Sequence, residues 1–381
     1  MTHVLSLWDT RTHELRALEA GPLVRLYVCG ITPYDSTHLG HAFTYVSFDA
    51  LIRYLEFGGH EVRYVRNVTD VDDDIVRKAR EYQELPQALT AREMERFSRD
   101  LASLNCRQAS EEPYATDYIP AMIAAVQRLC ADGSAYTLPD GRVYFDTAAS
   151  HCWGAFANLS REEMLVQFAE KGGDPEAPNK RDPLDFLLWQ PAGDDEPNWQ
   201  SPWGQGRPGW HIECSVMATE ELGPTLDIHG GGNDLVFPHH EAEVCQSQHL
   251  TGSEFSRFWL HTGMVALDGV KMSKSLGNLV FVSDLRERFD PLAVRRYLLS
   301  HHYRDAWEYD EAAMVEAEAG LKRWANVAAS GGVDDDAVER FHSAMCNDLQ
   351  TPDAIRAIDQ AAAVGAGETV RALANILGFT L

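Results

Sequence analysis

Two short segments of the chain carry the residues best suited to phosphate chemistry. Lys271 and Lys274 lie in one run, KMSKS, and His38 and His41 lie in another, HLGH, just before a predicted helix. Lysine is a mobile point charge for phosphate oxygens, and a helix start favours negative charge through its N–H groups and dipole. Either segment alone is a weak signal, because lysine-serine runs are typical of solvated loops and histidine pairs are often structural. Both suit the triphosphate of ATP, which would carry Mg²⁺.

A second set of residues has the chemistry of a metal site. Cys29, Cys214, His239 and Glu243 supply two thiols, an imidazole and a carboxylate. Zinc takes thiolate and imidazole ligands in tetrahedral sites. His239 and Glu243 are spaced i, i+4, which puts them on one face if their segment is helical. Spacing alone does not establish the site, because no CxxC pair is present and a cysteine at a strand end is typical of a core.

A parallel sheet is expected to position the first of these residues. Residues 23–29 have the pattern of a buried strand, residues 40–57 that of a helix, and residues 61–67 that of the next strand. This order predicts a right-handed βαβ unit and an α/β fold with an open parallel sheet. Ligands bind such sheets at the carboxyl ends of the strands, where Cys29 and residues 67–70 lie.

The chain is expected to divide into three parts. Residues 1–280 form a Rossmann-like catalytic domain with an insertion at about 100–205, rich in Gly, Pro and Asp in its second half. Residues 281–330 form a helical region after the KMSKS loop. Residues 331–381 form a short C-terminal helical tail.

Further elements are predicted on both sides of the KMSKS loop. The second half of the sheet is expected at 206–270, and helices are expected at 291–301 and 311–328. In the tail, Thr351 is the expected N-cap of a helix whose first residue is Pro352.

Composition excludes several classes of protein. The chain has 381 residues and a net charge of −25, which argues against a broad basic surface for a polyanion. Seven cysteines without a framework spacing favour a reducing cytoplasm over a disulfide-stapled secreted protein. The first residues show no signal peptide, and no stretch has the length of a membrane span. We therefore expect a cytoplasmic protein without a membrane partner.

The two phosphate segments resemble the HIGH and KMSKS signatures of class I aminoacyl-tRNA synthetases. Three longer stretches closely resemble the cysteinyl-tRNA synthetase family: GRPGWHIEC (206–214), DIHGGGNDL (227–235) and FPHHE (237–241). The resemblance implies a Rossmann-like catalytic domain with an insertion and a C-terminal helical domain, and it implies that residues 281–330 are a helical region of the kind that contacts a tRNA stem in synthetases. It also implies one zinc ion (Zn²⁺) that binds the thiolate of the substrate L-cysteine. Serine is then rejected without an editing site, because its hydroxyl is harder and far less acidic.

Two branches of this family share these motifs, and both are expected to form cysteinyl-adenylate from L-cysteine and ATP. One branch charges tRNA, and the other, the mycothiol cysteine ligases, joins cysteine to the amine of glucosaminyl-inositol. The stretches CGITPYD (29–35) and HLGHAFTYV (38–46) look more like the ligase version, and EKGGDP (170–175) resembles the ligase motif ERGGDP. The chain ends where a synthetase usually continues, and its tail from 331 is acidic. An ATP-dependent ligase with a small amine acceptor is therefore favoured over an enzyme that acts on tRNA.

Two features are typical of the synthetase branch instead. Glu243 matches the fourth-ligand carboxylate of the synthetases, and RDPLDFLLW (181–189) also resembles them. Cysteinyl-tRNA synthesis, or a different small amine acceptor, stays open as an alternative. A catalytically silent relative is a further alternative, against which the intact lysines, histidines and zinc ligands speak.

The resemblance implies a role for each matched residue. The expected zinc ligands are Cys29, Cys214, His239 and Glu243. The expected catalytic residues, which stabilise charge on the phosphates during adenylation, are His38, His41, Lys271 and Lys274. The residues expected to contact cysteine, ATP or the adenylate are Cys29, Gly30, Ile31, Thr32, Thr44, Asn67, Val68, Thr69, Trp210, Gly232, Asn233, Asp234 and Val265.

Overall fold

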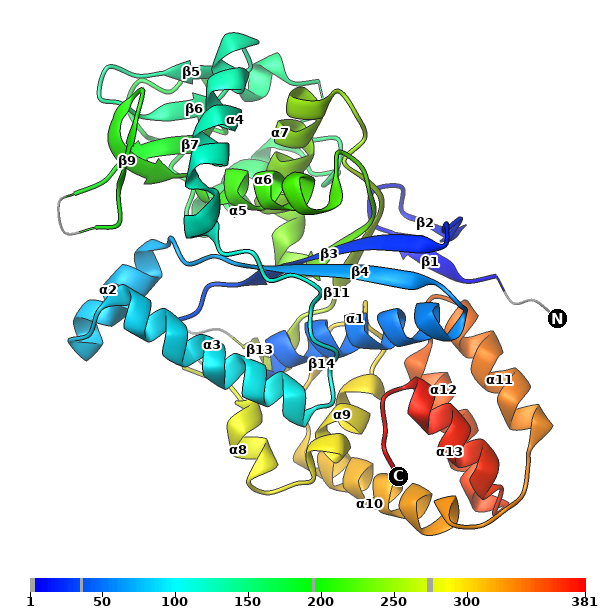
Figure 1. The fold of residues 1–381 in the computed structure, drawn as a ribbon. Helices are drawn as coiled ribbons and strands as arrows, with labels where there is room; N and C mark the ends of the chain where they lie inside the picture. The colour runs from blue at the N-terminus through cyan, green and yellow to red at the C-terminus, as the bar shows by residue number, and fades with distance from the viewer. Residues whose placement is uncertain (1–3, 35–36, 152, 194–195, 273–276) are drawn as a thin grey trace.

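The computed structural model describes residues 4–34, 37–151, 153–193, 196–272 and 277–381. At its centre lies a parallel sheet with the strand order β11-β10-β3-β4 (Figure 1). The predicted βαβ unit and the predicted second half of the sheet are both confirmed, and with them the α/β fold class. Their elements are β3 (Leu23–Ile31), α1 (Leu39–Phe57), β4 (Glu61–Val68), β10 (Leu226–Gly232) and β11 (Ser256–Thr262).

Helices cover both faces of this sheet, so most residues of its strands are buried. The helices are α1 and α9 (Pro291–Leu299) on one face, and α6 (Trp210–Leu222) and α7 (Glu241–Thr251) on the other (Figure 1). Contact between the layers is close. At Gly230 of β10 a Cβ atom would lie 2.0 Å from the ring of Phe48 in α1, so this position has no room for a side chain.

A five-stranded antiparallel sheet is inserted between the two halves of the parallel sheet, in the order β5-β6-β7-β9-β8. It lies on the α6–α7 side of the molecule, together with α4 and α5 (Figure 1). Its elements are η1 (Ala115–Tyr118), α4 (Ile119–Ala131), β5 (Ala135–Thr137), β6 (Val143–Phe145), η2 (Thr147–Ala149), α5 (Arg161–Glu170), β7 (Phe186–Pro191), β8 (Trp199–Ser201) and β9 (Gly204–Pro208). The chain reaches it from β4 through α2 (Asp73–Tyr82) and α3 (Pro86–Ser103).

Mostly helices follow the parallel sheet, and the two helices predicted there are observed as α9 and α10 (Glu311–Ala328). The predicted N-cap at Thr351 is wrong. Gln350 occupies that position, and Thr351 begins α12 and donates its hydroxyl to the carbonyl of His301 (3.4 Å). Packing against the end of α9 therefore overrides the local capping preference. The predicted domain boundaries at 280, 330 and in the insertion stay predictions.

Short elements complete the described chain. They are β1 (Ser6–Asp9), β2 (Glu14–Ala17), η3 (Asn233–Leu235), η4 (Val236–His240), β12 (Val265–Leu267), β13 (Val270–Lys271), α8 (Val282–Arg286), β14 (Trp307–Glu308), α11 (Asp335–Cys346), α12 (Thr351–Ala363) and α13 (Gly367–Ile376). None of the helices in the described ranges combines the length and the apolar character that a bilayer crossing requires.

Candidate functional site

A cavity of about 860 Å³ opens beside the carboxyl ends of β3 and β10. Ligands of parallel α/β sheets bind at this edge. Eleven of the residues predicted from the sequence line the cavity: Cys29, Gly30, Ile31, Thr32, His38, His41, Thr44, Trp210, Gly232, Asp234 and Val265. Glu170, the first residue of the EKGGDP segment, also lines it, as do Lys78 and Thr262, which no sequence motif had indicated.

Two stacked histidines lie at the start of α1 on the wall of this cavity. His38 is the N-cap, and its Nδ1 accepts a hydrogen bond from the N–H of Gly40 (3.1 Å). Nε2 is therefore the N–H donor of the neutral ring. The ring of His41 stacks on that of His38, with centroids 3.8 Å apart. Both imidazoles thus stand at a helix N-terminus, where the helix dipole favours an anionic group such as a phosphate.

Backbone pairing brings the KMSKS segment to the same cavity. β13, which contains the first residue of the motif, pairs with β12, and the N–H of Met272 donates to the carbonyl of Val265 (2.9 Å). Met272 and Val265 both line the cavity. Val280 follows the loop, and its carbonyl accepts the N–H of Leu39 (2.9 Å). This hydrogen bond ties the segment after the loop to the start of α1. The described residues on either side of the KMSKS loop therefore lie near the HLGH segment in the fold, although the two are far apart in the chain.

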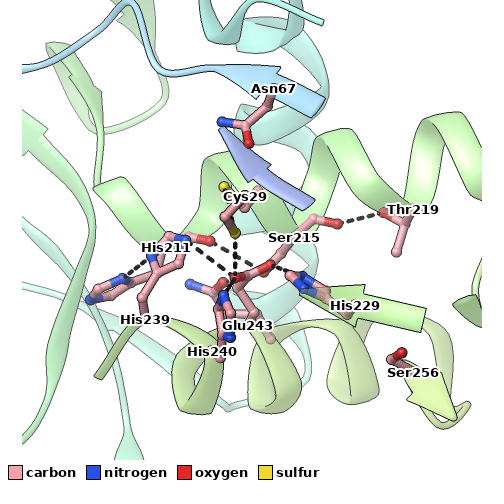
Figure 2. A network of polar contacts seen from close by, with 12 residues as sticks. Cys29, Asn67, His211, Ser215, Thr219, His229, His239, His240, Glu243 and Ser256 are labelled. Atoms are coloured by element: carbon pink, nitrogen blue, oxygen red, sulfur yellow. Dashed lines mark hydrogen bonds and ion pairs between the residues drawn. The ribbon is translucent and has the colours of Figure 1, made fainter. Parts of the chain in front are cut away.

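The candidate metal ligands lie together, and one of them, Cys29, lines the cavity. Cys29 lies near the end of β3 and faces Cys214 of α6, with the two Sγ atoms 3.9 Å apart. Oε1 of Glu243 in α7 lies 3.6 Å from the Sγ of Cys29 and 3.2 Å from the Nε2 of His239 (Figure 2). All four side chains are buried, and their ligand atoms lie within 4.8 Å of one another. This group could hold a metal ion.

The donor atoms fit zinc in particular. With Zn–S bonds of about 2.3 Å, two thiolates on a tetrahedral zinc stand about 3.8 Å apart, and the observed separation is 3.9 Å. Burial, helped by Cys214, raises the pKa of Cys29 well above its ordinary value, and burial does the same to the pKa of Glu243. A divalent cation would reverse both shifts, because it stabilises thiolate and carboxylate.

A shell of four further histidines surrounds this group, and sequence reasoning missed their role. They are His211, His229, His240 and His261. Nδ1 of His211 lies 2.9 Å from Nδ1 of His239, and Nε2 of His229 lies 3.0 Å from Oε2 of Glu243. Burial lowers the pKa of His211 and His229 to about 3, so both rings are neutral and can orient the candidate ligands. Three of the four stand within the motifs WHIEC, DIHGGG and FPHHE, which was the available signal.

Some predicted contact residues lie away from the cavity surface. Asn67, Val68 and Thr69 are buried at the end of β4, where Asn67 accepts the N–H of Gly30 (2.8 Å). Asn233 is exposed and does not line the cavity. A direct contact of these four with a ligand stays a prediction. The side chain of Lys271 and the whole of Lys274 lie outside the described residues.

The fold and the site together define a class I synthetase architecture. Mycobacterium tuberculosis methionyl-tRNA synthetase in complex with methionyl-adenylate superposes with a TM-score of 0.64 at 18% identity, over 90% of this chain and 82% of that chain. The family model of the class I (C) tRNA synthetase catalytic domain matches residues 16–319. The chain belongs to this family of class I tRNA synthetases.

Curated relatives within the family divide between two names. An L-cysteine:1D-myo-inositol 2-amino-2-deoxy-alpha-D-glucopyranoside ligase of Segniliparus rotundus is 44% identical, over 99% of this chain and 95% of the relative. Six further relatives with that name are 44–46% identical. A cysteine–tRNA ligase of Pseudomonas syringae pv. tomato is 42% identical, over 98% of this chain and 85% of the relative. Both names belong to ligases that act with cysteine.

Proposed function

We propose that the protein is an ATP-dependent, AMP-forming ligase that joins L-cysteine to the amine of glucosaminyl-inositol or a related small amine. It would act in mycothiol biosynthesis, and the use of ATP and free cysteine supports a cytoplasmic location. One observation carries the proposal. The cavity that the stacked pair His38 and His41 lines is also lined by Cys29, which belongs to the buried thiol and imidazole group with Cys214 and His239. The names of the ligase relatives at 44% and 46% identity support the amine acceptor.

The proposed reaction has two steps. A carboxylate oxygen of cysteine attacks the α-phosphorus of ATP in line, the bond to the bridging oxygen breaks, and pyrophosphate leaves. His38 and His41, with Lys271 and Lys274, would stabilise the charge on the phosphates. The acceptor nitrogen then attacks the carbonyl carbon of cysteinyl-AMP. A C–N bond forms, the C–O bond to the phosphate breaks, AMP leaves with that electron pair, and the nitrogen gives up one proton.

Zn²⁺ would be held by Cys29, Cys214 and His239, with the Glu243 carboxylate as a fourth ligand that the substrate displaces or joins. When bound, the ion would select cysteine by taking its thiolate. The position of Trp210 supports this arrangement. Its ring stacks on that of His239, with centroids 4.2 Å apart, and it lines the cavity that Cys29 also lines. Mg²⁺ would accompany ATP.

Thr32 and Asp234 support the placing of the other substrate groups. Both side chains are half-buried and line the cavity. The hydroxyl of Thr32, three residues beyond Cys29, would bind the cysteine amino group. The carboxylate of Asp234 would accept hydrogen bonds from the ribose hydroxyls of ATP.

Cysteinyl-tRNA synthesis is the second candidate function. Glu243 favours it, because Glu243 matches the fourth-ligand carboxylate of the synthetase branch and lies within the candidate metal group. The two candidates share the adenylation step and differ only in the acceptor.

The acceptor therefore decides between them. The purified protein would be incubated with ATP, Mg²⁺ and labelled L-cysteine, and offered either glucosaminyl-inositol or bulk tRNA. We expect AMP release and labelled product with the amino sugar alone. Cysteinyl-tRNA as the only product would replace the proposal by the synthetase function. Adenylate formation with neither acceptor would refute glucosaminyl-inositol as the acceptor.

A further inference from the structure

A second cavity, of about 280 Å³, adjoins the first. The proposed formation of cysteinyl-AMP does not use it. It lies between the loop after β4, the loop after α5 and strands β7 and β9 of the inserted sheet. Trp210 lines both cavities, and its side chain is about 36% exposed. The ring that stacks on the candidate metal ligand His239 is therefore also a wall of the second cavity. A molecule in this cavity would lie next to the place where cysteine is activated.

The EKGGDP segment forms one side of the second cavity, and its residues explain the shape of that side. Nζ of Lys171 donates to the carbonyls of Asp234 (2.8 Å) and Phe237 (2.5 Å), which ties the loop to the end of β10. Gly172 has φ +87°, a conformation that favours glycine. At Gly173 a Cβ atom would lie 2.4 Å from the ring of Phe168. These contacts hold the segment in one conformation along the side of the cavity.

The charges on the cavity wall disfavour a phosphate backbone. Nζ of Lys180 already donates to the carbonyls of Asp174 and Pro183, both at 2.7 Å. Arg207 is paired with Asp73 and, at 3.4 Å, with Glu196. The wall holds four carboxylates, and its three cations are all engaged in such contacts: Asp72, Asp73, Asp174, Asp185, Lys171, Lys180 and Arg207.

Polar groups on this wall suit a compact, hydroxyl-rich ligand. Gln190 of β7 adds a half-buried amide, and Tyr144 of β6 adds a phenol. The carboxylate of Asp174 accepts from the N–H of Glu176 (3.1 Å) through one of its oxygens. Amide and carboxylate groups match the hydroxyls of a sugar or cyclitol, and carboxylates also attract a protonated amine.

We infer that the second cavity binds the amine acceptor, a hydroxyl-rich amino sugar whose nitrogen points past Trp210 toward the activated cysteine. This inference rests on the proposed function, since it supplies the place from which the acceptor nitrogen attacks the carbonyl carbon of cysteinyl-AMP. Gln190 and Asp174 bind the hydroxyls of the acceptor, and Lys171 and the two glycines position the wall that carries Asp174.

Two variants with a matched control test the inference. Gln190→Leu removes the hydrogen-bonding amide, and Asp174→Asn removes the negative charge and one acceptor oxygen, both with little change of volume. Gln200→Leu makes the same change as Gln190→Leu at an exposed position of β8 that lines neither cavity. Cysteine-dependent ATP–pyrophosphate exchange measures activation, and AMP release with glucosaminyl-inositol measures transfer. We expect the KM for glucosaminyl-inositol to rise at least about fivefold in both variants. Exchange should stay near the wild-type rate, and the control should change neither measurement.

A second acceptor makes the test specific for the cavity. Free glucosamine keeps the amine and lacks the inositol, so the preference for glucosaminyl-inositol over glucosamine should shrink in the two variants. Unchanged KM values, or exchange reduced as much as transfer, would overturn the inference while leaving the proposed function in place. Intact exchange by the wild-type protein without any product from glucosaminyl-inositol would overturn the proposed function, and the inference with it.

Discussion

Glu243 is the residue that bears most directly on the choice between the two candidate functions. One of its oxygens lies 3.6 Å from the Sγ of Cys29 and 3.2 Å from the Nε2 of His239, and the other lies 3.0 Å from the Nε2 of His229. The carboxylate is therefore held by a neutral histidine on one side while it faces the candidate ligands on the other. This geometry suits a ligand that can leave the metal and keep a hydrogen-bond partner.

Removal of one thiol should separate metal binding from the rest of the site. In Cys214→Ala two of the soft donors remain, and we expect zinc affinity to fall by more than about a hundredfold, beyond the loss typical of outer-shell changes. Elemental analysis after dialysis measures the loss, and pyrophosphate exchange with serine against cysteine measures selectivity, which should collapse. Cys130→Ala, at a half-buried free cysteine of α4, is the control and should keep its zinc. A full equivalent of zinc in Cys214→Ala would contradict the assignment.

At the scale of elements, the site depends on how two strand ends meet. Asn67 of β4 accepts the N–H of Gly30 (2.8 Å) and donates to the hydroxyl of Thr69 (3.1 Å). At Gly30 a Cβ atom would lie 1.5 Å from the carbonyl oxygen of Asn67. The end of β3, which carries Cys29, is therefore placed by direct backbone contact with β4.

The substitution Gly30→Ala should push these two strand ends apart. We expect it to cost about 3 kcal/mol of unfolding free energy, at the upper end of overpacking effects. It should also lower zinc content, because Cys29 moves with the strand. Urea unfolding and elemental analysis report the two effects. Gly21→Ala is the matched control, since a Cβ there would meet its nearest atom at 3.9 Å, and stability equal to this control would refute the argument.

At the scale of the whole molecule, one buried guanidinium joins segments from both ends of the chain. Arg295 of α9 pairs with Asp49 of α1 and donates to the carbonyls of Leu104 (2.9 Å) and Leu377 (2.7 Å). Burial would raise the pKa of Asp49, but Arg295 and Arg53 outweigh it and hold that pKa below its ordinary value of 3.8. The C-terminal helices are thereby anchored to the helix that presents His38 and His41.

This ion pair makes a prediction about acid stability. A carboxyl whose pKa is lowered by folding stabilises the protein above its unfolded pKa, and that contribution is lost as the pH falls through the folded pKa. We expect Asp49→Asn to lose about 3–5 kcal/mol at pH 7, because Arg295 is left buried without its partner. Its stability should then fall less steeply than that of the wild type below about pH 4. Denaturant unfolding from pH 7 to 3 measures both effects, with the exposed Asp336→Asn as control. Parallel acid limbs for Asp49→Asn and wild type would refute the role.

Much of the fold could be predicted because its signals are local. Apolar runs and helical spacing predicted β3, α1 and β4 to within two residues at each end. The predicted N-cap at Thr351 was wrong, since Gln350 holds that position and the Thr351 hydroxyl donates to the carbonyl of His301 instead. The candidate ligands and the phosphate segments were identified by motif resemblance. The structure then brought Cys29, Cys214, His239 and Glu243 together.

The sequence by itself determined the chemistry available to this protein: two thiols, an imidazole and a carboxylate for a metal, and paired histidines and lysines for phosphates. Only the tertiary structure decided the supporting contacts, such as His229 against Glu243, and the second cavity beside Trp210. The physical reason is range. Periodicity and motifs report neighbours along the chain, whereas a histidine shell or a cavity wall exists only where elements distant in sequence pack together.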